Sequence, residues 1–270
     1  MNRTAPPLPK SDPPLREARI AGARLTFTDE GAGPLVLMAV HGVPGSVRDF
    51  RYMGPPLSEF ARLIRVDLPG SGGSEPRLDA LRRLEARAET VLALADHLGL
   101  ATFGVIGHSM GAATALVTAA AANARVSHLV LVAPIGLRPH RGLRQSPAYF
   151  RRLALMLRIP GLRQLLVPAM RRHYRKKRFP GAEAMTADDF RVQTEALTAA
   201  DYPLLNRAAT SPLAARTLVA YADDDHLVEP EIPAELAATI PGARALRFPD
   251  GGHVIQKNKA REIAAAIREL

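Results

Sequence analysis

Thr102-Phe-Gly-Val-Ile-Gly-His-Ser109-Met-Gly-Ala-Ala-Thr-Ala-Leu-Val117 is the stretch that decides the fold of this chain. It joins an apolar run typical of a buried strand to an Ala-rich helix through Gly107-His-Ser-Met-Gly111. Glycines on both sides of the turn let the backbone pass closely, and the turn presents the serine hydroxyl to a base. The dipole of the following helix favours negative charge that develops beside it. The stretch therefore predicts Ser109 as a nucleophile.

Strands and helices are predicted to alternate along the chain on both sides of this stretch. Unbroken apolar runs such as Leu35–Val40 and Ala61–Val66 are typical of strands buried on both faces. The other predicted strands are Arg24–Thr28, Thr102–Ile106, His128–Ala133, Thr217–Tyr221 and Ala243–Phe248, and the predicted helices are Ala80–Leu98, Ser109–Asn123, Pro233–Thr239 and a terminal helix with the stripe Ala260, Ile263, Ile267 and Leu270. This alternation predicts an α/β fold with a doubly wound, mostly parallel sheet.

The segment from residue 137 to 210 interrupts the alternation and carries the whole net charge of +10. It has 15 Lys and Arg against 5 Asp and Glu, whereas the rest of the chain has 21 of each sign. Its helix-like stretches lie around Tyr149–Leu157 and Ala187–Thr198, with prolines between them. The sequence thus predicts a proline-rich segment over residues 1–23, a core over 24–136 and 211–270, and a basic helical lid over 137–210. Such a lid lies where parallel sheets bind ligands, at the carboxyl ends of the strands.

A second glycine-rich turn, His41-Gly-Val-Pro-Gly-Ser46, follows the strand Leu35–Val40. Since parallel strands end at the same edge of a sheet, this turn is expected beside Ser109. The backbone N–H groups of Val43 and Met110 are then candidates for an oxyanion hole. A plain strand-to-helix turn is the alternative interpretation.

The general base must be one of eight histidines. His253, in Asp250-Gly-Gly-His253, follows the last strand on a loop flexible enough to reach the sheet edge. His108 points away from its neighbour Ser109 along the chain and is expected to pack or hydrogen-bond. Among the others, those at positions 97 and 128 are expected to be structural, and those at positions 140 and 173 are expected to be solvated in the basic insert.

An acid is needed to orient the imidazole and to stabilise its protonated form. Asp223-Asp-Asp225 follows the strand Thr217–Tyr221. A solvated turn is the ordinary interpretation of such a run, and local chemistry does not choose among the three carboxylates.

Together these features resemble the α/β-hydrolase superfamily, from about Arg24 to the end of the chain. The serine turn, the His-Gly turn, the loop Asp67-Leu-Pro-Gly-Ser-Gly-Gly-Ser74 and the order Ser, Asp, His all match. The resemblance implies the α/β-hydrolase fold, with a helical lid inserted after the sixth strand. It also favours Asp225 as the acid, because Ala222-Asp-Asp-Asp-His-Leu-Val228 matches the family's acid turn, and it leaves Asp223 as second choice.

The resemblance implies serine chemistry on a small acyl substrate. Haloalkane dehalogenases and epoxide hydrolases of this fold carry Asp at the turn, whereas this chain carries Ser109. Cleavage of a carboxylic ester through an acyl-serine, with no metal or organic cofactor, is therefore the leading expectation. The alternatives are a carbon–carbon bond hydrolase with the same three residues, and a non-catalytic receptor or scaffold with the hydrolase fold.

Composition bounds the location and the partners. The chain has no cysteine and no apolar run of about 20 residues, and five prolines between Met1 and Leu15 are unlike a signal peptide. A cytoplasmic location is expected. The basic insert has few aromatic residues and no nucleic-acid motif, so no nucleic-acid partner is expected. Its run Arg171-Arg-His-Tyr-Arg-Lys-Lys-Arg178, with apolar residues before it, allows weak contact with an anionic membrane surface.

Overall fold

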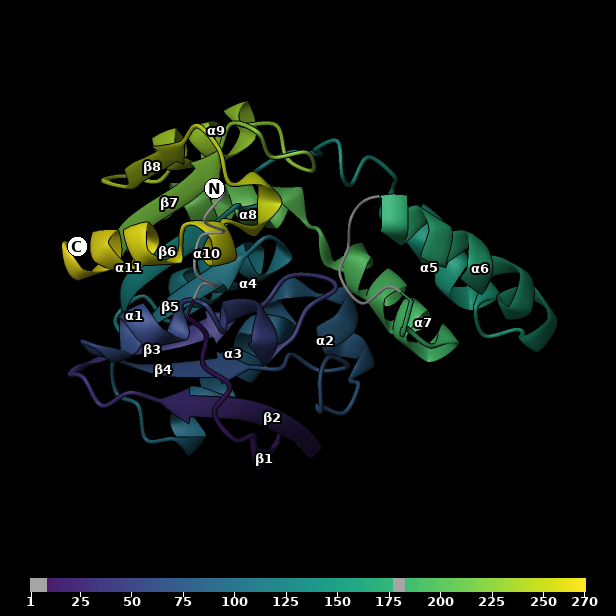
Figure 1. The fold of residues 1–270 in the computed structure, drawn as a ribbon, viewed down its shortest axis with the longest axis horizontal. Coiled ribbons are helices and arrows are strands. Elements are labelled where there is room, and N and C mark those ends of the chain that lie inside the picture. Colours follow the sequence, from purple (N-terminus) through teal and green to yellow (C-terminus); the bar gives the residue numbers. More distant parts are fainter. Residues whose placement is uncertain (1–8, 177–182) are drawn as a thin grey trace, which may run out of the picture.

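The computed structural model describes residues 9–176 and 183–270, and its strands form one sheet in the order β1-β2-β4-β3-β5-β6-β7-β8 (Figure 1). The strands are β1 Arg16–Ile20, β2 Ala23–Glu30, β3 Leu35–Val40, β4 Ala61–Val66, β5 Phe103–His108, β6 Val126–Val132, β7 Arg216–Ala222 and β8 Arg244–Phe248. β2 runs antiparallel to β1 and β4, and every other pair of neighbours is parallel. The predicted mostly parallel sheet is confirmed.

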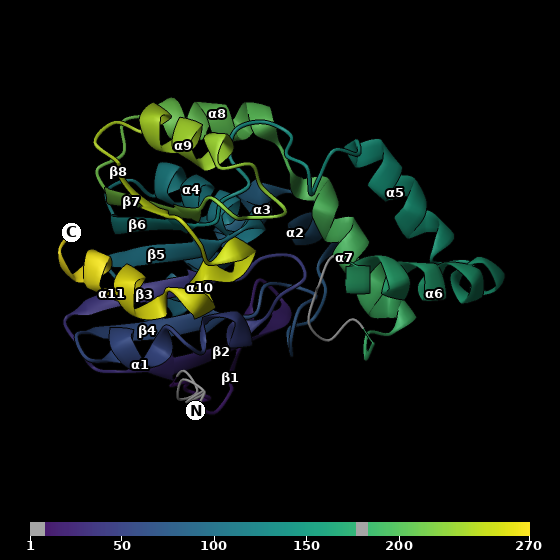
Figure 2. The ribbon, with the colours of Figure 1, turned by 45° about the horizontal axis from the view of Figure 1, so that its top comes forward.

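Helices cover both faces of this sheet (Figure 2). The helices are α1 Gly54–Ser58, α2 Leu78–Arg82, α3 Leu84–His97, α4 Met110–Ala121, α5 Pro147–Met156, α6 Pro160–Lys176, α7 Ala187–Ala196, α8 Tyr202–Thr210, α9 Glu231–Thr239, α10 Ile255–Asn258 and α11 Ala260–Arg268. α1 and α11 pack on one face, while α3, α4, α8 and α9 pack on the other. Successive residues of β3 alternate between these two cores: Leu37 joins one and Met38 the other. That alternation explains why the strand is apolar throughout.

Two features at the amino-terminal side of the fold differ from the expectation. Residues 16–20, which fall in the predicted proline-rich segment, form β1, and Ala18 and Ile20 are buried against the core. The predicted helix Ala80–Leu98 is two helices, because Arg83 between them has an extended backbone with φ −131° and ψ 130°. A charged edge strand and a single extended residue leave little trace in an apolar pattern.

The insert between β6 and β7 is helical and includes two helices that the sequence did not predict, α6 and α8. α6 contains Pro168, which ordinarily ends a helix. α5 and α6 project beyond the end of the sheet (Figures 1 and 2). α8, by contrast, buries Leu205 and Ala209 in the core beside α4, so the end of the predicted lid segment packs with the core.

No single helix among the described residues is both long and apolar enough to cross a membrane. The pair α5 and α6 reaches that length and composition only when taken together, and it is bent by 119°.

Candidate active site

Ser109 stands at the turn from β5 to α4 in a backbone conformation that few residues other than glycine adopt. Its φ is 55° and its ψ is −119°, and its N–H donates to the carbonyl of Val132, 2.9 Å away. Strained positions of this kind cluster at functional sites, where the surrounding structure enforces them. The adjacent strand thus holds Ser109 at the carboxyl edge of the sheet, as the sequence predicts.

The glycines on either side of Ser109 are required by close backbone contacts. A β-carbon on Gly107 would lie 2.3 Å from the carbonyl oxygen of Gly111. A β-carbon on Gly111 would lie 2.2 Å from the carbonyl oxygen of Val40 and 2.4 Å from that of His41. All three contacts are with backbone atoms, which cannot move aside cheaply, so a side chain at either position would force the turn to shift.

We expect Gly111→Ala to lower the free energy of unfolding by about 1–3 kcal/mol, the usual cost of overpacking, and to lower kcat because Ser109 shifts with its helix. Urea unfolding and steady-state kinetics measure the two effects. Gly161→Ala is the matched control, since a β-carbon at Gly161 would meet nothing within 4 Å. Unchanged stability in the Gly111 variant would contradict the geometry of this turn.

Ser109, His253 and Asp225 form one chain of hydrogen bonds. His253 Nε2 lies 2.9 Å from Ser109 Oγ, and His253 Nδ1 lies 2.8 Å from Asp225 Oδ2. Since the carboxylate accepts from Nδ1–H, Nε2 is left free to accept the serine proton. His253 and Asp225 are both buried. The structure therefore brings together the three residues that the sequence singled out.

The three consecutive aspartates have three different environments. Asp225 Oδ1 accepts hydrogen bonds from the N–H groups of Leu227 and Val228 at 2.8 and 3.1 Å. Burial disfavours its charge, but the hydrogen bond from His253 and these amides outweigh burial and lower the pKa of Asp225. Asp223 instead pairs with Arg247. Asp224 accepts a 2.7 Å hydrogen bond from the N–H of Gly252 and so fixes the loop that carries His253.

His108 supports the backbone of His253. Its Nε2 lies 2.8 Å from the carbonyl oxygen of His253, which makes Nε2–H the donor. Burial lowers the pKa of His108 to about 3, so the ring stays neutral. This matches the packing and hydrogen-bonding role expected from the sequence.

The His-Gly turn lies beside Ser109 and is fixed by two buried side chains. His41 accepts a hydrogen bond from the N–H of Leu68 at Nε2, 3.0 Å away. Asp67 Oδ1 accepts from the N–H of Val47 at 2.7 Å, and its other oxygen accepts from Thr26 Oγ1. A β-carbon on Gly42 would lie 3.1 Å from the β-carbon of Ser109. The loop that begins at Asp67 thus holds the turn against the serine.

A cavity of about 440 Å³ lies over Ser109. The core contributes Val43, Met110 and His253 to its wall, and the insert contributes mainly apolar side chains: Ile135, Leu143, Phe150, Leu153, Leu166 and Met170. No Lys or Arg belongs to its lining within residues 9–176 and 183–270. The two proposed oxyanion donors therefore share a cavity with Ser109, and the N–H of Met110, the first residue of α4, needs no partner within the helix.

Two polar residues of this cavity were not found from the sequence. His140, expected to be solvated, is buried, and its Nδ1 lies 2.9 Å from the carbonyl oxygen of Leu227. The expectation was wrong because the insert folds back onto the acid turn, a contact that no local pattern reveals. Asp49 follows the His-Gly turn, and burial raises the pKa of its carboxyl to about 7.

We expect Asp49 to make the stability of the protein depend on pH. A carboxyl with a pKa near 7 when folded and about 3.9 when unfolded binds its proton more tightly in the folded state. The stability it contributes is complete below pH 4 and is lost as the pH rises to about 7. Asp49→Asn should therefore gain stability over the wild type from pH 5 to pH 8. Urea unfolding of both proteins at pH 5 and at pH 8 tests this prediction. The same difference in free energy of unfolding between the variant and the wild type at the two pH values would contradict it.

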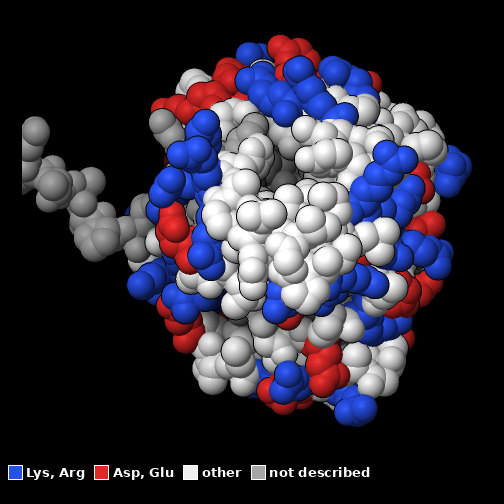
Figure 3. Space-filling view, turned by 90° about the vertical axis from the view of Figure 1, so that its right-hand side faces the viewer, with Lys and Arg blue, Asp and Glu red and all other residues white. Residues whose placement is uncertain are grey.

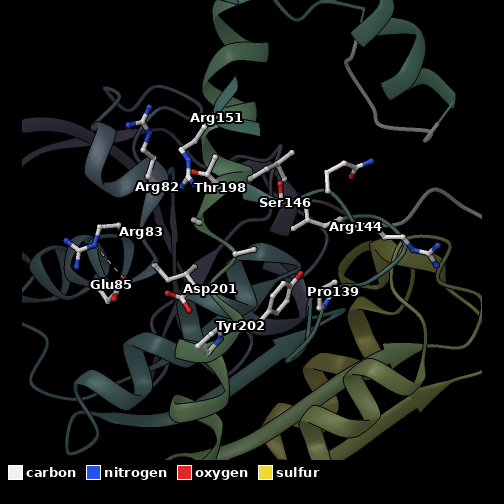
Figure 4. A pocket seen from close by; sticks show the side chains of 17 residues that line it. Arg82, Arg83, Glu85, Pro139, Arg144, Ser146, Arg151, Thr198, Asp201 and Tyr202 are labelled. Carbon is white, nitrogen blue, oxygen red and sulfur yellow. Dashed lines mark ion pairs between the residues drawn. The ribbon is translucent and has the colours of Figure 1, made fainter. Parts of the chain in front are cut away.

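A larger cavity, of about 690 Å³, lies on the other side of the wall formed by Leu143, Gln145 and Leu197. It contains none of the three hydrogen-bonded residues. Its lining includes four arginines, Arg82, Arg83, Arg144 and Arg151, with Glu85 and Asp201 (Figure 4). Size alone therefore does not identify the site of chemistry. Among the described residues, no group of three His, Asp or Glu side chains could hold a metal ion.

Comparison with known proteins identifies the family of the fold. The family model described as alpha/beta hydrolase fold matches residues 35–260. The chain is 33% identical, over 93% of its own length and 67% of the relative's, to the dihydrolipoyllysine-residue acetyltransferase component of the acetoin cleaving system of Pseudomonas putida. It is 27% identical to a 2-hydroxymuconate semialdehyde hydrolase of Pseudomonas putida, over 97% and 96% of the two lengths. A thermophilic esterase from Thermogutta terrifontis superposes with a TM-score of 0.75 and 25% identity, over 95% and 97% of the two chains.

Proposed function

The chain belongs to the α/β-hydrolase family, and from this premise we propose that it is a serine hydrolase that cleaves a carboxylic ester or a related acyl substrate. One observation carries the proposal: the hydrogen-bonded chain from Ser109 Oγ through His253 to Asp225 opens on an apolar cavity. A neutral imidazole with its second nitrogen on a carboxylate is what activates a serine hydroxyl.

In the first half of the reaction, His253 Nε2 removes the proton of Ser109 as Oγ attacks the carbonyl carbon. The negative charge that develops on the carbonyl oxygen is stabilised by the N–H groups of Val43 and Met110. His253 then gives its proton to the leaving alcohol, and the acyl group remains on Ser109. Asp225 stabilises the imidazolium formed between these steps.

In the second half, His253 takes a proton from a water molecule, and the resulting hydroxide attacks the acyl-Ser109 carbonyl. Collapse of the second tetrahedral species returns the proton from His253 to Ser109 and releases the acid. The same two N–H groups stabilise both tetrahedral species, and no cofactor takes part in any step.

The cavity favours an uncharged acyl group. Apolar side chains from α5 and α6 form much of its wall, and in the part of the chain that the structure describes no Lys or Arg lines it to pair with a carboxylate. We propose that the insert acts as a lid that encloses the acyl chain. The cytoplasmic location stays a prediction.

A second candidate is cleavage of a carbon–carbon bond next to a ketone by the same three residues. The similarity to the 2-hydroxymuconate semialdehyde hydrolase, which extends over nearly the full length of both chains, supports it. A substrate that carries a carboxylate would, however, meet no Lys or Arg among the described residues that line the cavity over Ser109.

A substrate panel decides between the two candidates. We expect the purified protein to hydrolyse p-nitrophenyl esters of neutral acids and to leave dienone acids intact, with Ser109→Ala as the control for background hydrolysis. Turnover of the dienone acids alone would select the second candidate. Turnover of neither class would contradict both, and would favour the receptor or scaffold alternative.

A further inference from the structure

The arm formed by α5 and α6, residues 147–176, exposes an unusual number of large apolar side chains. Five of the eight exposed large hydrophobic residues in the described part of the chain lie on it: Tyr149, Leu155, Met156, Ile159 and Leu165. Leu165 is 76% exposed, and Leu155 and Ile159 are each more than half exposed. Such a cluster on one element marks an interaction surface.

The same arm carries only positive charge. It contains eight Lys and Arg and no Asp or Glu. Five of these cations, Arg151, Arg152, Arg163, Arg172 and Lys176, are exposed and have no ion-pair partner among residues 9–176 and 183–270. Figure 3 looks onto this end of the molecule and shows a broad area without charged side chains, with Lys and Arg around its edge.

The other side of the arm faces the active site. Phe150 and Leu153 of α5, with Leu166 and Met170 of α6, line the cavity over Ser109. Of the exposed apolar residues, Tyr149 also reaches this cavity, whereas Leu155, Met156, Ile159 and Leu165 do not line it. A single layer of helices therefore separates the outer apolar patch from the cavity.

We propose that the outer face of this arm docks on the surface of an anionic lipid bilayer. The apolar side chains enter the boundary between headgroups and acyl chains, and the arginines around them pair with lipid phosphates. Eight cations within residues 147–176 favour lying on the surface over spanning the bilayer. Docking places the cavity over Ser109 one layer of helices from the lipid. The proposal concerns binding and does not depend on the proposed hydrolysis.

A second copy of the chain is the main alternative occupant of this surface, and charge disfavours it. In a symmetric dimer the same patch faces itself, so the arginines around one patch would meet those around the other. An anionic bilayer carries the opposite charge, so its headgroups attract the cationic edge, and its acyl chains accept the apolar side chains at the centre of the patch.

The test is co-sedimentation of the intact protein with vesicles of phosphatidylcholine alone and with vesicles that also contain phosphatidylglycerol. We expect binding to the mixed vesicles and not to phosphatidylcholine alone. Binding should weaken sharply between about 0.05 M and about 0.5 M salt, because the Debye length shortens over this range. Ser109→Ala should bind as the wild type does, so that a failure of the hydrolase proposal stays distinguishable from a failure of this one.

Two variants on the arm identify the surface responsible. Each cation near an anionic bilayer contributes about a factor of five to the partition coefficient, so Arg152→Glu with Arg163→Glu should weaken binding by more than 25-fold. Leu155→Ser with Ile159→Ser should weaken it through the apolar patch. Neither pair lines the cavity over Ser109, and hydrolysis of a soluble ester should stay unchanged.

The matched controls make the same chemical changes elsewhere on the surface. Arg19→Glu with Arg261→Glu changes the net charge equally at two exposed arginines outside the insert, and Leu78→Ser removes an exposed leucine from α2. The controls should bind vesicles as the wild type does. No binding to mixed vesicles at low salt, equal loss in arm and control variants, or a dimer in analytical ultracentrifugation that the Leu155/Ile159 variant abolishes would each overturn the proposal.

Discussion

Replacing Ser109 with alanine is expected to lower kcat on an ester substrate by on the order of 10⁶-fold, which is the loss that follows removal of a serine nucleophile. Ser109 lies at the start of α4, with its hydroxyl 2.9 Å from His253 Nε2. Alanine retains the β-carbon and the backbone of the turn, so the fold should persist. Steady-state kinetics with circular dichroism and urea unfolding separate the two effects.

His253→Ala should match this loss closely, and the double variant should lose no more than either single one. Members of such a unit act together, so their contributions do not add. Wild-type turnover in either single variant, with the protein folded, would mean that the hydrogen-bonded chain does not carry the reaction.

Asp225→Asn is expected to lower kcat by on the order of 10⁴-fold. An amide in place of the carboxylate no longer fixes the proton on His253 Nδ1 and cannot stabilise the imidazolium. Asparagine retains Oδ1, which accepts from the N–H groups of Leu227 and Val228, so the turn should keep its shape. The comparison of kcat at matched substrate saturation measures the effect.

The neighbouring aspartates are internal controls for this prediction. Asp223→Asn removes an exposed ion pair with Arg247, which solvent screens, and should leave turnover within about tenfold. Asp224→Asn keeps an acceptor for the N–H of Gly252 and should behave alike. If turnover fell by several orders of magnitude in Asp223→Asn and not at all in Asp225→Asn, the carboxylate that orients His253 would be Asp223 and our assignment would be wrong.

Where local chemistry determines a structure, the sequence predicted it closely. Leu35–Val40 and Ala61–Val66 are strands with the predicted bounds. A strand of a parallel sheet is buried on both faces, so it appears in the sequence as an unbroken apolar run between turn residues. Gly107 and Gly111 pass so close to other backbone atoms that this turn favours glycine at both positions. The convergence of Ser109, His253 and a carboxylate follows because parallel strands end at one edge.

Features that depend on contacts distant in the sequence were not predicted. β1 lies at the sheet edge, where charged residues alternate with Ala18 and Ile20, and its pairing with β2 is visible only in the fold. His140 is buried because the insert returns to Leu227. The choice of Asp225 over Asp223 came from the family resemblance, since nothing in three consecutive aspartates shows which one faces the imidazole. Part of the basic run, at Lys177 and Arg178, lies outside the described residues.

The central claim is that His253 and Asp225 activate Ser109 as a nucleophile, and covalent labelling tests it most directly. The intact wild-type protein is incubated with a fluorophosphonate probe, which reacts only with an activated serine, and the adduct is located by peptide mass spectrometry. We predict one adduct, on Ser109, that is lost in His253→Ala and greatly slowed in Asp225→Asn. A folded wild-type protein that stays unlabelled, or that carries the probe on another serine, would contradict the claim.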